Sequence, residues 1–316
     1  MEAKSPGFRG GVAAAAGWIA LVALATLTPA IVRTQEQFQF VVSARDAGGR
    51  PVVDLRREEI VMLENGVANE IVKVEPFHIP VKLTIAVDNG IHSRNALVHY
   101  RAGLEGLIRK LPPDMEVALL STAPQPRFVV RPTMDRVRLL RGINAFVPED
   151  ATPRFADTLV EFSKRLQEEF YRTKRFDSLP VILLVSTTAG ENYSYRATEI
   201  NTALDFLSTR KTRVYVAMTT TGIDPTTDAG HQPTIAIPLV KATNGRYEAL
   251  SNTSRLMTLL PEFGDEIAAL HQRRNNQLLV TASRQEGLRG PLQNPRIELT
   301  RSNLKGQVSL DGLPPN

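Results

Sequence analysis

The sequence predicts an α/β protein whose main domain has a doubly wound, mostly parallel sheet, and three observations favour this class. Continuously apolar segments such as VILLVST (Val181–Thr187) alternate with segments of helical periodicity. Strands that expose neither face to water are typical of parallel sheets covered by helices on both sides. Short alternating segments before and after this region indicate additional antiparallel strands. The 316 residues, of which 42% are hydrophobic, are enough to build both cores.

The first thirty residues have the composition of an export signal. Lys4 and Arg9 precede the apolar run GVAAAAGWIALVALATL, and small residues continue as far as Ala30. This order of basic, apolar and small-residue regions is typical of a secretory signal peptide. We therefore expect residues 1–30 to be a signal peptide cleaved near Ala30, and the mature protein to be periplasmic or extracellular. The alternative is an uncleaved membrane anchor, because Gly11–Val32 approaches the roughly 20 residues that span a bilayer.

Charge and cysteine content narrow the possible functions. The formal net charge is +5 and the pI is about 9.5. Basic and acidic residues are interleaved, however, and no basic stripe with intervening aromatic residues occurs, so a nucleic-acid partner is not expected. The chain has no cysteine. Disulfides and thiol chemistry are therefore excluded, and an exported protein of this composition depends on its hydrophobic cores for stability.

Residues 38–77 are predicted to form a small β unit. The segment FQFVVSARD alternates apolar and polar residues, DAGGRP indicates a turn, and two short strands meet at Asn65-Gly66. An Asn-Gly pair between alternating apolar residues is the strongest short hairpin signal. Between them, Asp54–Ile60 is expected to be a helical turn or a loop. About forty residues bury too little surface to be stable alone, so this unit is expected to pack against later parts of the chain.

Residues 80–272 carry the alternation that defines the α/β domain. The expected strands are 83–87, 115–121, 127–131 at an edge, 181–187 and 214–218. The expected helices are 96–111, 134–146, 155–170, 197–207 and 254–271. The helix at 155–170 shows its periodicity most clearly, because its large apolar residues recur at steps of three and four.

Residues 275–312 return to short alternating segments, at 277–283, 296–300 and 306–310. Polar connections rich in Gly and Pro separate them, which favours antiparallel strands. We expect these strands to complete a small β-sandwich-like unit with residues 38–77. Such pairing would bring the two ends of the mature chain together.

The order of these segments resembles the von Willebrand factor A-related domain proteins common in acidobacterial secretomes. From Phe40 to Gly66, FVVSARDAGGRPVVDLRREEIVMLENG is similar to that family's V-x-D-x-x-G-x-P-V and L-x-x-x-D-F-x-V-x-E-D-G segments. The main domain then opens with LTIAVD, a strand that ends in an acid, and NGRYEAL (Asn244–Leu250) is similar to the family's T-G-G-R-Y segment. The resemblance covers most of the mature chain and implies a von Willebrand A, or Rossmann-like, domain.

The resemblance also implies a divalent-cation site, the metal-ion-dependent adhesion site. In the family this site consists of D-x-S-x-S after the first strand, a threonine from a later loop, and an Asp after the fourth strand. Asp88 matches the first Asp, and Thr152 is the candidate loop threonine. Gly90 and His92 stand where the family has its serines, and Thr187 stands where it has the second Asp.

One acid is too few ligands for Mg²⁺, which requires an octahedral set of oxygens and loses its water reluctantly. We therefore expect a degenerate adhesion site with no metal and no cofactor. In that case Asp88 accepts hydrogen bonds from backbone N–H groups of the Asn89-Gly90 turn, or caps the helix after it. The alternative is a cation-dependent binder with rebuilt ligands, for which Glu149, Asp150 and Asp157 are the candidates.

Motifs of the common enzyme classes are absent. The sequence has no G-x-S-x-G elbow, G-x-G-x-x-G loop, P-loop or H-E-x-x-H motif. Asp88 and His92 are the one pair with acid/base character at the sheet edge where such folds bind ligands, and Ser93, Thr187 or Thr188 would be the nucleophile. A hydrolase using this pair is the less favoured alternative. No catalytic residue is expected.

A contact surface is the remaining hypothesis. Tyr193 and Tyr195, in the segment ENYSYR after the fourth strand, are of a residue type enriched at binding hot spots. Alternatively they are half-packed side chains of a polar loop. We expect an exported, non-catalytic adhesion or scaffolding module with a protein partner, and membrane contact only through an uncleaved N-terminal segment. The predicted partner-binding rim consists of Asp88, Gly90, His92, Thr152, Thr187, Tyr193 and Tyr195.

Overall fold

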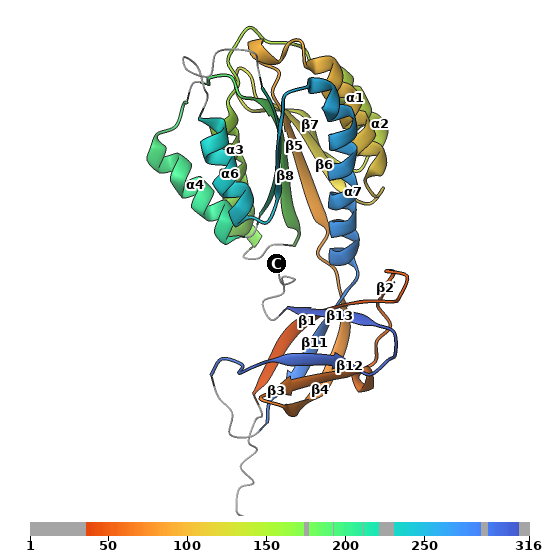
Figure 1. Cartoon of the computed structure of the whole chain (residues 1–316). Helices are drawn as coiled ribbons and strands as arrows, with labels where there is room; N and C mark the ends of the chain where they lie inside the picture. Colours follow the sequence, from red (N-terminus) through yellow and green to blue (C-terminus); the bar gives the residue numbers. More distant parts are fainter. Residues whose placement is uncertain are drawn as a thin grey trace, which may run out of the picture. The chain divides into compact units, whose positions relative to one another are not determined.

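The computed structural model describes residues 36–173, 177–191, 193–210, 212–220, 231–285 and 290–309. The predicted signal peptide, residues 1–30, lies outside these ranges. Within them, no helix combines the length and the apolar character that crossing a membrane requires. The strands form one sheet of six strands and another of seven (Figure 1).

The six-stranded sheet belongs to the predicted α/β domain. Its strand order is β10-β9-β8-β5-β6-β7, in which β7 is antiparallel to β6 and all other neighbours are parallel. The carboxyl ends of the parallel strands therefore meet at one edge. The strands are β5 (Val81–Val87), β6 (Glu116–Ser121), β7 (Arg127–Thr133), β8 (Leu179–Thr187), β9 (Arg213–Thr219) and β10 (Arg246–Leu250).

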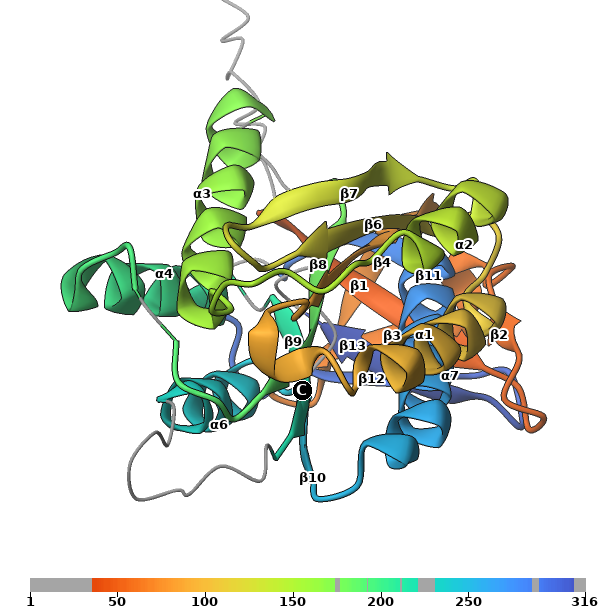
Figure 2. The same cartoon turned by 90° about the horizontal axis from the view of Figure 1, so that it is seen from above.

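Helices cover both faces of this sheet, as Figures 1 and 2 show. On one face lie α1 (Leu97–Lys110), α2 (Arg136–Asn144) and α7 (Leu256–Asn275). On the other lie α3 (Phe155–Thr173), α4 (Ala197–Thr209) and α6 (Gln232–Ala242). Consecutive residues of β8 enter opposite cores, Leu183 on the α1 side and Leu184 on the α3 side. This two-sided packing explains why the whole of β8 is apolar or small and buried.

The seven-stranded sheet is antiparallel and contains both ends of the described chain. Its order is β12-β3-β4-β11-β1-β13, with β2 paired to β1. Strands β12 and β13, at the two ends of this order, also contact each other, so the sheet curls around its own core. The strands are β1 (Gln37–Arg45), β2 (Pro51–Val52), β3 (Ile60–Glu64), β4 (Val67–Phe77), β11 (Gln277–Ser283), β12 (Arg296–Leu299) and β13 (Lys305–Ser309). The expected pairing between N-terminal and C-terminal strands is present.

The predicted Asn65-Gly66 hairpin joins β3 to β4. Both turn residues have positive φ, 50° at Asn65 and 81° at Gly66. A two-residue turn of this kind matches the twist of the paired strands, and Asn and Gly are the residues that adopt it at least cost. The hairpin is confirmed.

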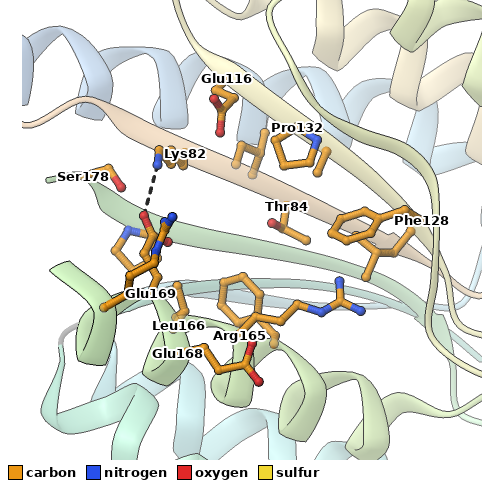
Figure 3. A pocket seen from close by; sticks show the side chains of 16 residues that line it. Lys82, Thr84, Glu116, Phe128, Pro132, Arg165, Leu166, Glu168, Glu169 and Ser178 are labelled. Carbon is orange, nitrogen blue, oxygen red and sulfur yellow. Dashed lines mark hydrogen bonds and ion pairs between the residues drawn. The ribbon is translucent and has the colours of Figure 1, made fainter. Parts of the chain in front are cut away.

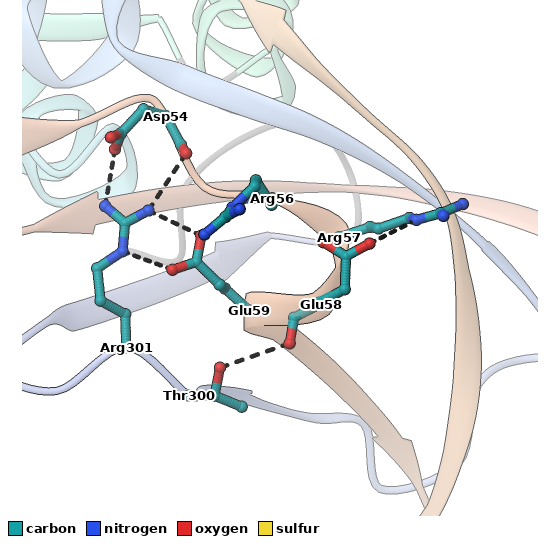
Figure 4. A network of polar contacts seen from close by, with 7 residues as sticks. All are labelled: Asp54, Arg56, Arg57, Glu58, Glu59, Thr300 and Arg301. Carbon is teal, nitrogen blue, oxygen red and sulfur yellow. Dashed lines mark hydrogen bonds and ion pairs between the residues drawn. The ribbon is translucent and has the colours of Figure 1, made fainter.

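An ion-pair network ties the turn before β3 to the turn after β12 (Figure 4). Arg301 donates to both carboxylate oxygens of Glu59, each at 2.7 Å, and to Asp54 Oδ1 at 2.8 Å. Glu59 belongs to the short 3₁₀ helix η1 (Arg57–Glu59). The guanidinium of Arg301 lowers the pKa of Glu59 to about 2. Of the two predicted forms of this segment, a helical turn or a loop, the structure has the helical turn, held by a residue far along the chain.

The α/β class is confirmed, but the short strand β2 and two elements of the α/β domain, helix α6 and strand β10, were missed. Helix α6 contains Pro233 in its first turn and Pro238 inside, so its sequence does not show a continuous helical pattern. Strand β10 lies in the segment NGRYEAL. The sequence predicted no strand there and gave only a resemblance to T-G-G-R-Y. Strand β10 extends the sheet beyond β9 to its edge, and α6 packs on the face that α3 and α4 cover.

Candidate functional site

Asp88 comes directly after β5 at the carboxyl edge of the sheet and is completely buried. Its Oδ1 accepts a hydrogen bond from the Gly90 N–H at 2.8 Å, as expected for the Asn89-Gly90 turn. Its Oδ2 accepts one from the Thr187 hydroxyl at 2.9 Å, at the end of neighbouring strand β8. Burial raises the pKa of Asp88, and these two hydrogen bonds partly offset that rise.

A buried hydroxyl layer continues from Asp88 along the sheet edge. The Tyr100 hydroxyl, from α1, lies 3.2 Å from the Thr219 hydroxyl at the end of β9. Thr219 lies 3.3 Å from the Ser186 carbonyl of β8. Burial, together with the charge of Asp88, raises the pKa of Tyr100, so its hydroxyl keeps its proton. Strands β5, β8 and β9 are thus joined by side-chain hydrogen bonds that are closed to solvent.

The segment 147–153, between α2 and α3, covers the Asp88 turn. The Asn89 side chain donates to the Val147 carbonyl at 3.0 Å, and the Asn89 carbonyl accepts from Glu149 N–H at 2.8 Å. The Ile91 N–H donates to the Ala151 carbonyl at 3.0 Å. These three hydrogen bonds, made at both ends of the turn, hold the segment over the carboxylate and exclude water from it.

Gly90 is required by this cover. A Cβ atom at position 90 would lie 2.7 Å from the Ala151 carbonyl oxygen and 3.1 Å from two Pro153 atoms. Distances below 3.0 Å do not occur between a real Cβ and backbone oxygen, so any side chain here would displace the segment. The family's serine therefore does not fit at this position in this chain.

A second polar cluster lies at the first turn of α3. The preceding residues, TPR, offer no Ser, Asp or Asn at the N-cap position, so the helix needs another acceptor for its free N–H groups. Glu191, after β8, supplies it: Oε2 accepts from Phe155 N–H and, at 3.3 Å, from Ala156 N–H. Glu191 Oε1 is buried without a hydrogen-bond partner among the described residues. Burial raises the pKa of Glu191 to about 7.

Asp157 and Arg154 join the loops around this cluster. Both carboxylate oxygens of Asp157 accept from the Ser194 N–H at 3.0 Å. Arg154 donates to the Ser194 hydroxyl at 3.3 Å and to the Pro124 carbonyl at 3.2 Å. Arg154 also lies 3.7 Å from Asp157. The loops after β6 and β8 and the start of α3 therefore form one connected surface at the carboxyl edge of the sheet.

The two tyrosines of this loop have different environments. Tyr193 is 37% exposed, and its ring centroid lies 6.5 Å from that of His231. Tyr195 is half-buried; its hydroxyl donates to Glu161, and the Lys164 ammonium lies 4.0 Å from its ring centroid. Tyr195 therefore fixes the loop to α3, whereas Tyr193 is the more exposed of the two.

The residues of the predicted rim differ in how far they are buried. Asp88, Gly90 and Thr187 are brought together and are buried. Thr152 lies in the covering segment and is half-buried, as is Tyr195. His92 and Tyr193 are exposed. A partner at this edge would contact exposed loop residues, while the buried trio supports those loops from below.

The candidate replacement ligands do not gather around Asp88. The described ranges contain no group of three or more acidic or histidine side chains arranged to hold a metal. Arg127 pairs with Glu149, Arg94 pairs with Asp150, and Asp157 accepts from Ser194. Each acid thus already has a partner from the protein.

Glu191 was not singled out in the sequence, although a signal existed. An acidic residue two positions before Tyr193 faced a helix that lacked its own N-cap. Pairing the two would have required knowing that the loop after β8 lies beside the start of α3, which sequence periodicity does not reveal.

Comparisons with known proteins find similarity in structure alone. No protein-family model matches the chain, and no curated protein matches it. A von Willebrand factor type A protein from Catenulispora acidiphila is 10% identical, with a TM-score of 0.46 over 75% of this chain and 51% of that one. BatB from Bacteroides thetaiotaomicron is 13% identical, with a TM-score of 0.42 over 60% and 98% of the two chains. An aerotolerance-related membrane protein from Bacteroides fragilis is 10% identical, with a TM-score of 0.41 over 59% and 99%. The chain thus spans about half of the first of these structures.

Proposed function

We propose that the protein is an exported, non-catalytic interaction module of the von Willebrand factor A type, which binds a protein partner without a divalent cation. The hydrogen bonding and burial of Asp88 support this proposal most directly. Each of its carboxylate oxygens accepts a hydrogen bond from the protein, and the segment 147–153 covers them. The export part of the proposal rests on the sequence of residues 1–30.

The hydroxyl at position 187 supports the metal-independent form of the proposal. Thr187 donates to Asp88, whereas an Asp at position 187 would repel it unless a cation lay between them. A cation entering here would have to displace the Thr187 hydrogen bond and open the segment at Ala151. With one carboxylate as its only anionic ligand, the ion would not recover the energy of losing its hydration shell.

Calorimetry tests the metal-independent form of the proposal. Titration of the mature chain with Mg²⁺, Mn²⁺ and Ca²⁺ is expected to show no saturable binding. Asp88→Asn, which keeps the acceptor for Gly90 but removes the charge, serves as the test variant. Asp205→Asn removes an exposed acid from α4, away from the candidate ligands, and serves as the control. Tight binding that is lost in Asp88→Asn and kept in Asp205→Asn would favour the cation-dependent alternative with rebuilt ligands.

The partner surface is proposed to include Tyr193 and His92, which are the exposed members of the rim. Cross-linking in the native envelope fraction, in the presence of a chelator, should recover a partner with the wild-type chain. Tyr193→Ala should reduce the recovery, while Tyr171→Ala, at an exposed tyrosine near the far end of α3, should not. Recovery that needs added Mg²⁺, or that Tyr171→Ala reduces equally, would contradict this surface.

A hydrolase using Asp88 and His92 is the weaker alternative. His92 is exposed on η2 (Ile91–Ser93), Asp88 is buried, and no hydrogen bond joins the two side chains in the described part of the chain. An acid/base dyad needs its two groups within hydrogen-bond reach. A screen of esters and phosphoesters should give no turnover above background; turnover abolished by His92→Ala would reverse this conclusion.

A further inference from the structure

A cavity lies on the face of the six-stranded sheet that α3 flanks, away from the proposed rim. Its volume is about 500 Å³, within the range of pockets that bind small organic ligands. Strands β5 and β6 form the floor with Thr84, Ala118 and Leu120, and α3 forms one wall with Phe162 and Leu166. The short side chains of Thr84 and Ala118 leave the floor open. Its interior is mainly apolar.

Figure 3 shows Lys82 and Glu169 at one end of the cavity and Arg165 beside Phe128 at the other. Lys82 donates to Glu169 at 3.2 Å and is the register neighbour of Glu116 on β6. Glu168 and Arg172 of α3 also belong to the lining, so acids and bases are mixed around Lys82 and Glu169. At the other end, the guanidinium carbon of Arg165 lies 4.4 Å from the centroid of the Phe128 ring. Arg131 also approaches this ring, at 5.6 Å.

Arg165 is the group that specifies a ligand. Among the described residues, no ion pair or hydrogen bond joins it to a neighbour, and its guanidinium carbon lies over the Phe128 ring. The N–H groups at the edge of a stacked guanidinium stay available, and they match the geometry of a carboxylate. Two arginines beside one ring also create a locally positive end that an anion would stabilise.

We propose that this cavity binds a small amphipathic carboxylate, with its acid group on Arg165 and its aliphatic body on the floor between α3 and the sheet. A medium-chain fatty acid has this chemistry. Its chain would lie against Leu120, Phe162 and Leu166, and its length is limited by the charged end at Lys82, Glu116 and Glu169. This activity is independent of the protein-binding rim.

Calorimetric titration of the mature chain with decanoate, below its micelle-forming concentration, tests the proposal. Decanoate is expected to bind saturably, and decyltrimethylammonium, with the opposite charge, is not. Arg165→Gln should weaken decanoate binding about tenfold or more, because a charge-assisted hydrogen bond is lost. Arg109→Gln, which removes an exposed arginine from α1 on the other face, should leave it unchanged.

A second variant separates the apolar contact from the charge. Ala118→Leu places a larger side chain in the floor and should weaken binding of both decanoate and neutral decanol. Circular dichroism confirms that each variant is folded. The proposal is overturned if decanoate shows no saturable binding to the wild-type chain, or if Arg165→Gln and Arg109→Gln bind it equally well.

Discussion

At the scale of single residues, two buried carboxylates define the carboxyl edge of the sheet and are stabilised differently. Asp88 has both oxygens hydrogen-bonded, whereas Glu191 has one oxygen bonded to the first turn of α3 and the other unpaired within the described part of the chain. An unpaired buried oxygen makes the charged form costly. Asp88 therefore acts as a structural acceptor, and Glu191 is a group at this edge whose protonation changes near neutral pH.

Gly90→Ser is expected to destabilise the protein. The new Cβ would lie 2.7 Å from the Ala151 carbonyl, so the covering segment must move. Such overpacking costs about 1–3 kcal/mol in the free energy of unfolding, measurable by denaturant titration. Gly48→Ser serves as the control, because its Cβ would meet only the flexible Asp46 side chain, at 3.3 Å, and the far end of Arg50. Equal stability of the two variants would show that the segment does not close over Asp88.

Glu191→Gln is expected to stabilise the protein above neutral pH. The pKa of Glu191 rises to about 7 on folding, from an ordinary value of 4.5, so the native state binds more protons between these values. Stability from this group is therefore highest at low pH and falls as the pH rises through 7. Thermal unfolding should show that the variant gains at pH 8, by at most about 3 kcal/mol, and gains little at pH 5. Glu168→Gln, an exposed acid on α3, should show no such difference between the two pH values.

The hydrogen bonds and the burial of side chains at the carboxyl edge of the six-stranded sheet were only partly predictable from the sequence. The hydrogen bond from the Asn89-Gly90 turn to Asp88 follows from local sequence, and the structure contains it. The burial of Asp88 does not follow, because it depends on residues 147–153 folding back over position 90. The partner of Thr187 could be inferred only from the alignment of neighbouring strand ends. The exposed positions of His92 and Tyr193 agree with a contact surface, whose function stays a prediction.

At the scale of elements, a buried ion pair fixes the β3–β4 hairpin to the end of β11. Arg284 Nε donates to Glu64 Oε2 at 2.9 Å, and Gln293 N–H donates to Glu64 Oε1 at 3.0 Å. Both side chains are almost fully buried, at 0% for Glu64 and 3% for Arg284. Arg284 also donates to the Gly290 carbonyl at 2.6 Å. This pair connects three segments that periodicity alone could not bring together.

Glu64→Gln is expected to cost about 1–3 kcal/mol at pH 7, because Arg284 loses its counter-charge while keeping one hydrogen-bond acceptor. Glu70→Gln removes an exposed acid from β4 and should have little effect. Arg284 lowers the pKa of Glu64, so the stabilisation is complete above the ordinary value of 4.5 and is lost as the pH falls through the lowered pKa. Chemical denaturation at pH 7 and pH 3 should therefore show a smaller difference at pH 3. A constant difference would argue against an ionised Glu64.

Element prediction succeeded where the pattern was long and local. Helix α3 has clear helical periodicity and strand β8 is a continuous apolar run, and the structure extends both by only a few residues. Helix α6 was missed because its two prolines suggest breaks in a helix. Pro233 lies in the first turn, where proline is tolerated, and the structure accommodates Pro238 inside the helix. The core against β9 selects the helix there in spite of low intrinsic propensity.

At the scale of the whole molecule, the chain begins and ends its described part in the same sheet. Strand β11 lies between β1 and β4, so one C-terminal strand has two N-terminal neighbours. The sequence indicated that the ends could pair, because both have alternating patterns, but register and neighbours depend on long-range packing.

Deletion of residues 38–77 is expected to expose β11 to proteolysis. The deletion removes both of its neighbours and leaves an apolar strand with two open edges. Limited proteolysis with mass measurement should show rapid cleavage within residues 277–309, while residues 81–275 remain protected because their helices and sheet have separate cores. Cleavage spread equally over both ranges would show that the two cores fold only together.

The most direct test of a metal-free Asp88 is a crystal of the mature chain soaked in manganese and measured for anomalous scattering. With Thr187 donating to Asp88 and residues 147–153 closed over it, no manganese peak is expected within bonding distance of the Asp88 carboxylate. A well-occupied, six-coordinate ion bound to Asp88 would contradict this expectation and restore a cation-dependent site.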